Sequence, residues 1–341
     1  MRELEGEELA RFVRGRELFD RDFGHESGVG QPRFNGDSCR ACHFDPVIGG
    51  SGPRDVNVIR QGISNGDGEF VSPHVGTILH KETIELDRGV MAQEVVDIFE
   101  HRQTPHLFGL GLVGLISDET IVANADPQDI DGDGISGRVS ITDGGRVGRF
   151  GWKAQVPSIA EFVRDAMAVE LGITVETQEG MTFGRVDDND DTDDPELSAT
   201  EAQDLAFFLT MLAPPPRQVF DNVEQVETGE TLFGEVGCAA CHIAELETSS
   251  GPARLYSDLL LHEILPTGSL GIEDGSANMW EFRTAPLWGV SQTAPYFHDG
   301  AADTLDQAIL MHDGEAATSR DDYQALSESD RNAVLAFLST L

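Results

Sequence analysis

The feature that most constrains this chain is a short motif that occurs twice. The stretches GDSCRACHFDPVIGG (36–50) and GCAACH (237–242) each contain Cys-x-x-Cys-His, and together they use all four cysteines of the 341 residues. The motif residues are Cys39, Cys42, His43, Cys238, Cys241 and His242. A cysteine pair directly before a histidine is the attachment signal for c-type haem, in which the thiols form thioethers and the histidine ligates iron. We therefore expect two covalently bound haem c groups, with His43 and His242 as iron ligands.

Two other uses of the cysteines fit the spacing less well. Structural zinc ligand pairs usually lie close together in a chain, whereas these pairs lie at residues 39–42 and 238–241. A thioredoxin-like redox motif requires neither the histidine nor the duplication. Haem attachment explains both features, so we favour it over zinc and over thiol redox chemistry.

The charge of the chain excludes one class of partner. The formal net charge is -38, and the only lysines are Lys81 and Lys153. Binding to nucleic acid needs a basic surface, so nucleic acid is excluded as a partner. A basic redox protein could be steered to such an acidic surface, but we favour the simpler interpretation of a solvated acidic surface suited to high salt. The run DDNDDTDD (187–194) is expected to be an acidic loop.

The sequence also bears on location. No apolar run reaches the length needed to span a membrane. Covalent haem attachment takes place outside the bacterial cytoplasmic membrane, so we expect an exported protein, periplasmic or extracellular. The first residues, MRELEGEELARFVRGRELF, contain no apolar signal core. We therefore expect that a leader was cleaved or lies outside this sequence.

An internal repeat predicts the fold. Each haem motif is preceded by Gly-x-x-Leu-Phe, and LSATEAQDLAFFLTML (197–212) aligns without a gap with LSESDRNAVLAFLSTL (326–341). Both closing segments read as amphipathic helices capped by serine, with Ser198 and Glu201 as a capping box. The repeat of opening helix, haem motif and closing helix resembles the class I cytochrome c fold, in which the first and last helices pack across each other. The repeated glycines, leucines and phenylalanines are Gly15, Leu18, Phe19, Gly229, Leu232 and Phe233.

The prolines of APPPRQ (213–218) interrupt the helical pattern between the two repeats. We therefore predict a mainly α protein with two cytochrome c-like domains. The first, at 1–213, carries a long insertion, and the second occupies 217–341.

Further segments extend the likeness beyond the haem motifs. They are FNGDSCRACH, DIDGDGISGR, GRFGWKAQVPSIAEF, FRTAPLWGVSQTAPYFHDGAADTLDQAILMHDGEA and the closing helix. With these segments the chain resembles the bacterial di-haem cytochrome c peroxidase superfamily. It is most similar to the di-haem oxidoreductase branch, which includes thiol oxidoreductases and peroxidases.

The resemblance implies two catalytic residues in the insertion. In the peroxidases a tryptophan lies between the haems, and Trp152 matches its position, six residues before Ser158. A core tryptophan is the alternative interpretation. Glu170 in AVELGIT matches the acidic residue over the distal face of the first haem, where a carboxylate transfers the proton needed for peroxide O–O cleavage. The companion glutamine of the peroxidases is absent, because Ala160 or Phe162 stands at its position.

The resemblance also implies ligands of the second haem. The peroxidases place a methionine ligand eight residues after a threonine, and from Thr304 this position is His312. Met311 is the competing ligand, one position out of register. We favour His312, which would make a bis-histidine haem of lower potential. Such a haem is suited to stabilise a highly oxidised state shared by both haems.

Other residues of the second half are expected to serve the second haem or a calcium ion. His298 would organise the second haem pocket, and Arg283 would pair with a haem propionate, although both could be ordinary loop residues. The superfamily holds calcium through a Thr-x-Pro segment and an asparagine, which Thr293, Pro295 and, more weakly, Asn57 match.

A second possible calcium loop lies in DIDGDGISGR. Its aspartates are Asp129, Asp131 and Asp133, but the EF-hand glutamate is replaced by Ser140. A partial calcium loop and a plain Asp-Gly turn both remain open for this stretch.

Together these features predict a di-haem oxidoreductase. It would reduce hydrogen peroxide or another small oxidant at the His43 haem, or use it to oxidise a further substrate. Electrons would come from a redox protein or a small reductant, by way of the second haem. One alternative is a non-catalytic electron carrier, which the long insertion disfavours. Another is an oxygen-dependent haem oxygenase of an organic substrate, like the related rubber-cleaving di-haem enzymes.

Overall fold

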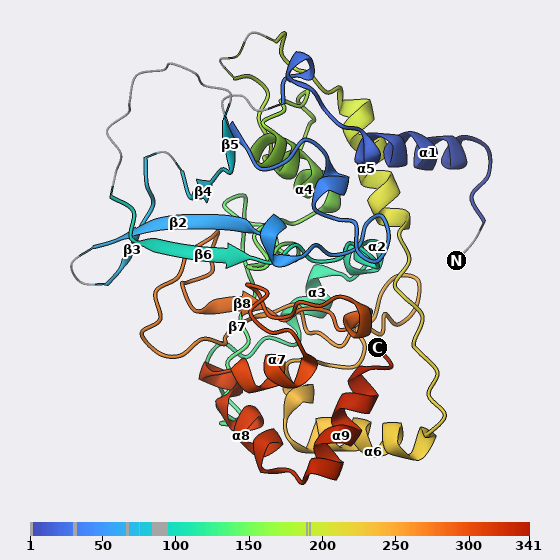
Figure 1. The fold of residues 1–341 in the computed structure, drawn as a ribbon, viewed down its shortest axis with the longest axis vertical. Coiled ribbons are helices and arrows are strands. Elements are labelled where there is room, and N and C mark those ends of the chain that lie inside the picture. Colours follow the sequence, from blue (N-terminus) through green and yellow to red (C-terminus); the bar gives the residue numbers. More distant parts are fainter. Residues whose placement is uncertain are drawn as a thin grey trace. The chain divides into compact units, whose positions relative to one another are not determined.

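The chain divides into two compact units. The computed structural model describes residues 3–29, 33–65, 68–74, 76–83, 95–188, 190 and 192–341 (Figure 1). Unit 1 comprises Met1–Gly111 and Val156–Ala213, and unit 2 comprises Leu112–Gln155 and Pro214–Leu341. The division after Ala213 coincides with the proline-rich boundary predicted from sequence. Residues 112–155, expected in the first domain, group instead with the second unit.

Unit 1 contains the first repeat and most of the strands. Its helices are α1 (Gly6–Asp20), α4 (Ile159–Ala166) and α5 (Ala199–Met211), and a π-helical turn at Met167–Leu171 continues α4. Its strands are β1 (Arg33–Phe34), β2 (Val58–Ser64), β3 (Phe70–Val71), β4 (Ile78–Leu79), β5 (Glu82–Thr83) and β6 (Ile98–Arg102). The short helix α2 (Leu110–Gly114) includes the point of division.

Unit 2 contains the second repeat. Its helices are α3 (Asp118–Val122), α6 (Val223–Glu235), α7 (Leu305–Met311), α8 (Ala317–Ala325) and α9 (Glu328–Leu338). Its strands β7 (Leu261–Glu263) and β8 (Glu281–Arg283) form an antiparallel pair. Thr304 caps α7 through a capping box with Gln307.

The opening and closing helices of each unit pack directly against one another. A Cβ added to Gly15 of α1 would lie 2.0 Å from the Asp204 carbonyl oxygen of α5. A Cβ added to Gly229 of α6 would lie 1.9 Å from the Ala333 carbonyl oxygen of α9. Only glycine permits backbones to approach so closely. The repeated glycine therefore sets the same helix crossing in both units, as the likeness to cytochrome c predicts.

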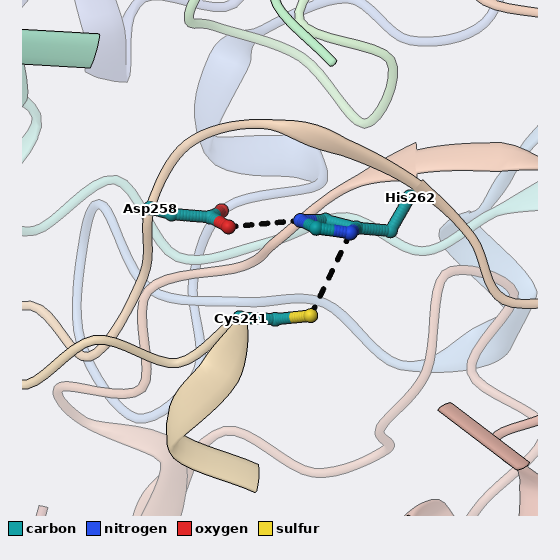
Figure 2. Close-up of side chains that lie close together, drawn as sticks. All are labelled: Cys241, Asp258 and His262. Atoms are coloured by element: carbon teal, nitrogen blue, oxygen red, sulfur yellow. Dashed lines mark hydrogen bonds and ion pairs between the residues drawn. The ribbon is translucent and has the colours of Figure 1, made fainter. Parts of the chain in front are cut away.

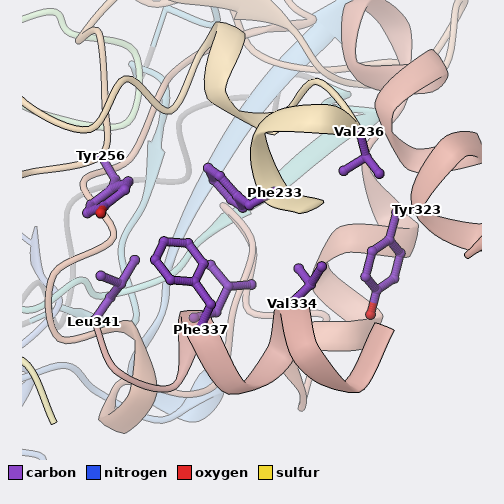
Figure 3. Close-up of a cluster of buried hydrophobic side chains, with 8 residues drawn as sticks. Phe233, Val236, Tyr256, Tyr323, Val334, Phe337 and Leu341 are labelled. Carbon is purple, nitrogen blue, oxygen red and sulfur yellow. The ribbon is translucent and has the colours of Figure 1, made fainter. Parts of the chain in front are cut away.

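The core of unit 2 forms at this crossing. Figure 3 shows the rings of Phe233, Tyr256 and Phe337 between α6 and α9. The buried cluster consists of Phe233, Val236, Tyr256, Tyr323, Val334, Phe337, Leu338 and Leu341. Burial of large aromatic and branched side chains of this kind is the main source of stability for such a small helix pair.

The closing helices begin where the sequence predicts. Ser198 accepts a hydrogen bond from the Glu201 backbone N–H, and Glu201 bonds back to Ser198, which confirms the capping box. Ser327 accepts from the Asp330 backbone N–H at the start of α9. Such caps satisfy backbone donors that the first turn of a helix leaves without partners.

The prediction of a mainly α protein is wrong. The structure is 34% helical and 13% strand. In unit 1, β2 pairs with β3, β4 and β6, all antiparallel, within the insertion that follows the first haem motif (Figure 1). The sequence of β6 does not show the alternation of apolar and polar residues that indicates a strand. Its buried positions include Glu100 and Arg102, which form an ion pair, whereas Phe99 is exposed.

Candidate functional site

Both Cys-x-x-Cys-His motifs adopt the same local structure. Each cysteine pair lies on a 3-10 turn, Cys39–Ala41 in unit 1 and Cys238–Ala240 in unit 2. The His43 backbone N–H donates to the Cys39 carbonyl at 3.0 Å, and the His242 N–H donates to the Cys238 carbonyl at 3.0 Å. None of the four cysteines forms a disulfide. The turn therefore carries two thiols and a histidine on one compact loop, as thioether attachment requires.

The histidine rings are oriented by backbone carbonyls. His43 Nδ1 lies 2.9 Å from the Pro105 carbonyl oxygen, and His242 Nδ1 lies 2.8 Å from that of Tyr256. A hydrogen bond from Nδ1–H to a carbonyl fixes the tautomer that leaves the Nε2 lone pair for a metal. Burial lowers the pKa of both imidazoles to about 4, so the rings stay neutral near neutral pH. Both histidines therefore fit the role of a ligand to haem iron.

The repeated phenylalanine contacts each ligand histidine in the same way. The ring centroids of Phe19 and His43 are 6.3 Å apart, and those of Phe233 and His242 are also 6.3 Å apart. The two ring pairs are tilted by 51° and 56°. The Gly-x-x-Leu-Phe repeat therefore does two things at once: its glycine sets the helix crossing, and its phenylalanine packs on the ligand.

In unit 1, Glu170 lies near the first motif. It belongs to the π-helical turn Met167–Leu171, a local deviation that is common at functional sites. Asn35 Nδ2 donates to Glu170 Oε2 at 2.6 Å, and the Asn35 backbone N–H donates to the Glu170 carbonyl at 2.7 Å. Burial raises the pKa of the Cys42 thiol to about 11, and the charge of Glu170 adds to this rise. Glu170 is thus held within electrostatic reach of the attachment cysteine.

The electrostatics of Glu170 suit proton transfer. Burial raises its pKa, while the bond from Asn35 and the charges of Arg60 and Lys81 partly oppose the rise. Lys81 also donates its backbone N–H to Asn35 Oδ1 at 3.0 Å. A carboxyl group whose pKa moves toward neutrality both accepts and donates protons efficiently.

In unit 2, His312 follows directly after α7 and is firmly positioned. Its Nδ1 lies 2.8 Å from the Ala308 carbonyl oxygen, and Arg320 donates to the His312 carbonyl at 2.9 Å. The Phe297 ring meets the His312 ring edge to face, with centroids 5.4 Å apart. The charge of His312 adds to the effect of burial in lowering the pKa of His242, which indicates that the two imidazoles are near each other.

The structure places Trp152 and Arg283 together in unit 2. The Arg283 backbone N–H donates to the Trp152 carbonyl at 2.7 Å. The Arg283 guanidinium donates to the carbonyls of Gly151 and Thr284 at 3.0 Å each, and burial lowers its pKa to about 10. The Trp152 side chain is half-buried. His298, which is 7% exposed, stacks on Phe282 with ring centroids 4.0 Å apart.

The residues matched to a calcium site fall in different units. Asn57 belongs to unit 1 and is 1% exposed, whereas Thr293 and Pro295 belong to unit 2. Thr293 Oγ1 donates to the Gly289 carbonyl at 3.2 Å. A calcium ion bound by these three residues stays a prediction. The carboxylates of Asp129, Asp131 and Asp133 lie within 4.8 Å of one another, on exposed or half-exposed side chains.

A buried polar cluster beside the second motif has no counterpart in the sequence prediction. His262 on β7 places Nε2 2.8 Å from Asp258 Oδ2 and Nδ1 3.6 Å from Cys241 Sγ (Figure 2). The same Nδ1 lies 2.9 Å from Glu315 Oε2. Asp258 and His262 are 2% and 3% exposed. The stretch SDLLLHEI (257–264) offered a signal, because an acid and a histidine stand four residues apart with three leucines between them.

Asn35 was missed for a different reason. It stands four residues before Cys39 and 135 residues before Glu170, so nothing in its neighbourhood marks it as a partner of a carboxylate. Only the fold, which brings the segment before the first motif against the π-helical turn, makes this contact.

The known proteins that resemble this chain are di-haem oxidoreductases and peroxidases. The family model described as "Di-haem oxidoreductase, putative peroxidase" matches residues 82–341. A cytochrome c551 peroxidase of Pseudomonas aeruginosa is 31% identical over 123 residues, which are 34% of this chain and 34% of that protein. The corresponding peroxidase of Nitrosomonas europaea is 29% identical over 128 residues, 35% of this chain and 34% of that protein. The match thus spans about a third of the length of these curated relatives.

A solved structure shows the same fold. The crystal structure of the diheme peroxidase BthA from Burkholderia thailandensis aligns with a TM-score of 0.50 at 15% identity, over 97% of this chain and 86% of that one. Within the residues that the structure describes, no helix is both long and apolar enough to cross a membrane. Because the family model matches most of the chain, the protein belongs to the di-haem oxidoreductase family, whose members carry two haem cofactors.

Proposed function

We propose that this protein reacts with hydrogen peroxide at the haem on His43 and passes electrons between that site and the haem on His242. The observation that supports the proposal is that Asn35 holds Glu170, whose pKa is raised, within electrostatic reach of the attachment cysteine Cys42. The two relatives reported above are cytochrome c551 peroxidases, which also supports the proposal. The peroxide would be reduced, or used to oxidise a further substrate.

The bound haem supplies the one-electron redox chemistry. The role of the chain is to move a proton. Asn35 Nδ2 donates to Glu170 Oε2 and so fixes the plane of the carboxyl group, leaving Oε1 as the atom that takes the proton from one peroxide oxygen and returns it to the other. Positioned general acids and bases of this kind contribute about 10²–10⁴-fold to a rate.

For the second haem we propose that His242 and His312 would both bind its iron. Each ring directs Nδ1 to a backbone carbonyl, of Tyr256 and of Ala308, which leaves Nε2 of both for the iron. The proposal takes His312 rather than Met311 because His312 stands eight residues after Thr304, where the peroxidases have their ligand. Two histidines give a lower potential than a histidine with a methionine.

Trp152, Arg283 and His298 are proposed to serve the second haem and its connection to the first. Trp152 would relay electrons between the haems. Arg283, which is fixed to the carbonyls of Gly151 and Thr284, would pair with a haem propionate. His298 would support the pocket through its stack on Phe282.

We further propose a calcium ion held by oxygens of Thr293, Pro295 and Asn57, ligands of the hard type that this cation prefers. The protein would act in the periplasm or outside the cell, because covalent haem attachment takes place there. Its reductant would be a redox protein or a small molecule.

An electron paramagnetic resonance (EPR) spectrum of the oxidised, haem-loaded protein tests the proposal. We expect one high-spin signal from the His43 haem and one low-spin signal from the His242 haem, both diminished by one equivalent of hydrogen peroxide. Two low-spin signals that peroxide leaves unchanged would favour an electron carrier. A product formed from an organic substrate with dioxygen and without peroxide would instead identify an oxygenase.

Two substitutions test the residue roles. Glu170→Gln should slow the peroxide-dependent decay of the high-spin signal by about 100-fold. The exposed Glu179→Gln is the matched control and should leave the rate unchanged. An unchanged rate in Glu170→Gln would remove Glu170 from the mechanism. His312→Gly should convert the low-spin second haem to high spin, and an unaltered low-spin signal would overturn the ligand assignment.

A further inference from the structure

The buried cluster beside Cys241 links four segments of unit 2. His262 comes from β7, Asp258 from the loop before it, and Glu315 from the 3-10 turn Gly314–Ala316. Ser136 donates its backbone N–H to Glu315 Oε2 at 3.0 Å and its hydroxyl to Glu315 Oε1 at 2.7 Å. The Leu260 backbone N–H donates to Asp258 Oδ1 at 2.9 Å, and Asp258 Oδ2 meets His262. Both carboxylates of the cluster are therefore bound by more than one donor.

The geometry makes His262 a cation. Its Nε2 lies 2.8 Å from Asp258 Oδ2 and its Nδ1 lies 2.9 Å from Glu315 Oε2. A neutral imidazole has only one N–H, so it satisfies one carboxylate and not two. Burial opposes the charge, but the hydrogen bonds to Asp258, Cys241 and Glu315 outweigh it and raise the pKa of His262. Both bonds are therefore charge-assisted, the strong class of hydrogen bond.

One end of this cluster is attached to the haem motif. The Asp258 backbone N–H donates to the Cys241 carbonyl at 3.0 Å, and His262 Nδ1 lies 3.6 Å from Cys241 Sγ. The adjacent Tyr256 carbonyl accepts from the ligand histidine His242. The segment 256–258 thus holds both the thioether cysteine and the proximal ligand.

The other end is attached to the segment that carries His312. Glu315 stands three residues after His312, and the Asp313 backbone N–H donates to the Ile264 carbonyl at 3.1 Å. Gly314 has a φ of +56°, and a Cβ there would lie 2.3 Å from the Glu263 carbonyl oxygen. Strand β7 and the turn after His312 are therefore in direct backbone contact, with the Glu315–His262 ion pair beside it.

The alternative role for this cluster is to bind a metal ion. Cys241, Asp258 and His262 each offer one ligand atom, and these atoms lie within 4.8 Å of one another. Haem attachment, however, converts the Cys241 thiol to a thioether, which is a far poorer ligand than a thiolate. In the haem-loaded protein His262 is instead committed to the two carboxylates.

We propose that the Asp258–His262–Glu315 triad is a positioning device that fixes His312 relative to the haem attached at Cys241. This rests on the proposed ligation by His312. His262 and Glu315 are positioning residues: they act on the iron only through His312. The triad keeps the distance between the attachment turn and the ligand segment constant, so the second haem stays six-coordinate.

The test is the spin state of the second haem in resting, oxidised protein. Glu315→Gln should retain both haems but raise the ratio of high-spin to low-spin second haem by about tenfold, because a charge-assisted bond is lost. Glu315→Asp keeps the charge and should restore most of the low-spin signal. The exposed Glu273→Gln is the matched control for the loss of one negative charge and should leave the spectrum unchanged.

His262→Gln provides the second variant and should give the same direction of change. If His262→Gln fails to load haem, the spin states of Glu315→Gln and Glu315→Asp alone decide whether the triad positions His312. Unaltered low-spin signals in Glu315→Gln, with both haems present, would overturn the proposal. No peroxide is used, so a failed peroxidase reaction does not affect the result. His312→Gly, read by the same spectrum, tells separately whether His312 is the ligand.

Discussion

The two haem-attachment regions share a framework and differ in what surrounds it. In both, a glycine sets the helix crossing, and a phenylalanine lies with its ring centroid 6.3 Å from that of the ligand histidine. Within electrostatic reach of Cys42, however, lies the carboxyl group of Glu170, which is held by the amide of Asn35. Beside Cys241 stands an imidazolium enclosed by two carboxylates.

This difference teaches how a duplicated unit acquires two tasks. In the proposed function, the shared framework would hold the haem and present one histidine to its iron. The residues that differ would then give the two sites their separate tasks. An amide-bound carboxyl group with a raised pKa suits a reaction that moves protons, whereas a rigid charged triad suits a site whose ligands must stay in place.

The largest expected effect is the loss of one haem when the two cysteines of a motif are replaced. Cys39→Ala with Cys42→Ala should abolish attachment of the first haem, because the thioethers cannot form, and should leave only the low-spin signal. Cys238→Ala with Cys241→Ala should leave only the high-spin signal. Haem content by the pyridine haemochrome assay, together with EPR, checks both. If the two double variants lose the same signal, the proposed division of roles is wrong.

The glycine at each helix crossing should not tolerate replacement by a larger residue. Gly229→Ala and Gly15→Ala should each lower the free energy of unfolding by about 2–3 kcal/mol, because the added Cβ forces the helices apart. Gly234→Ala, in the same helix as Gly229, meets nothing within 4 Å and should stabilise by up to about 1 kcal/mol. Urea unfolding measures all three. Equal free energies of unfolding for Gly229→Ala and Gly234→Ala would rule out the close approach of α6 and α9.

The carboxyl group at the first haem should make stability depend on pH. Burial raises the folded-state pKa of Glu170, so its contribution is fully present below the ordinary glutamate pKa and is lost as pH rises through the folded value. Relative to Glu170→Gln, the wild-type protein should lose ~1.4 kcal/mol for each pH unit between the two values. Urea unfolding at about pH 4 and about pH 8 tests this, with Glu179→Gln as control. A constant difference between Glu170→Gln and wild type across this range would contradict it.

The smallest effect concerns the closing helices. Ser198 takes part in a full capping box, whereas Ser327 bonds Asp330 through its hydroxyl, which accepts from the Asp330 N–H and donates to Asp330 Oδ2. Ser198→Ala should cost about 1 kcal/mol and Ser327→Ala about half of that. Thermal unfolding of the two variants, with Ser→Asp rescue at each position, compares the caps. A larger loss of stability in Ser327→Ala than in Ser198→Ala would contradict this prediction.

Much of this architecture could be predicted from the sequence because it is local. The Cys-x-x-Cys-His motifs, the Gly-x-x-Leu-Phe repeat and the Ser198 capping box each lie within a few residues, and the structure has the helices and the cap where they were expected. The family resemblance was confirmed by the family model. Matches to Trp152, Glu170 and the calcium residues still depend on the proposed experiments.

The rest could not be predicted because it depends on contacts between distant segments. The β6 strand carries Glu100 and Arg102 on its buried face, so its alternation is not one of apolar and polar residues. Its pairing with β2 made the mainly α prediction wrong. Asn35 meets Glu170 across 135 residues, and His262 meets Glu315 across 53. No sequence periodicity or motif predicts contacts between residues so far apart in the chain.

The glycine after the second haem's proposed ligand has a consequence for how that ligand could change in evolution. Because the Glu263 carbonyl leaves no room for a side chain at position 314, the backbone there cannot slide by one residue without bringing a Cβ into the gap. A slip that exchanged His312 for Met311 would do so. Ligand identity at this iron should therefore change by point substitution at 312, through which a lineage could set the haem's potential while the backbone stays in register.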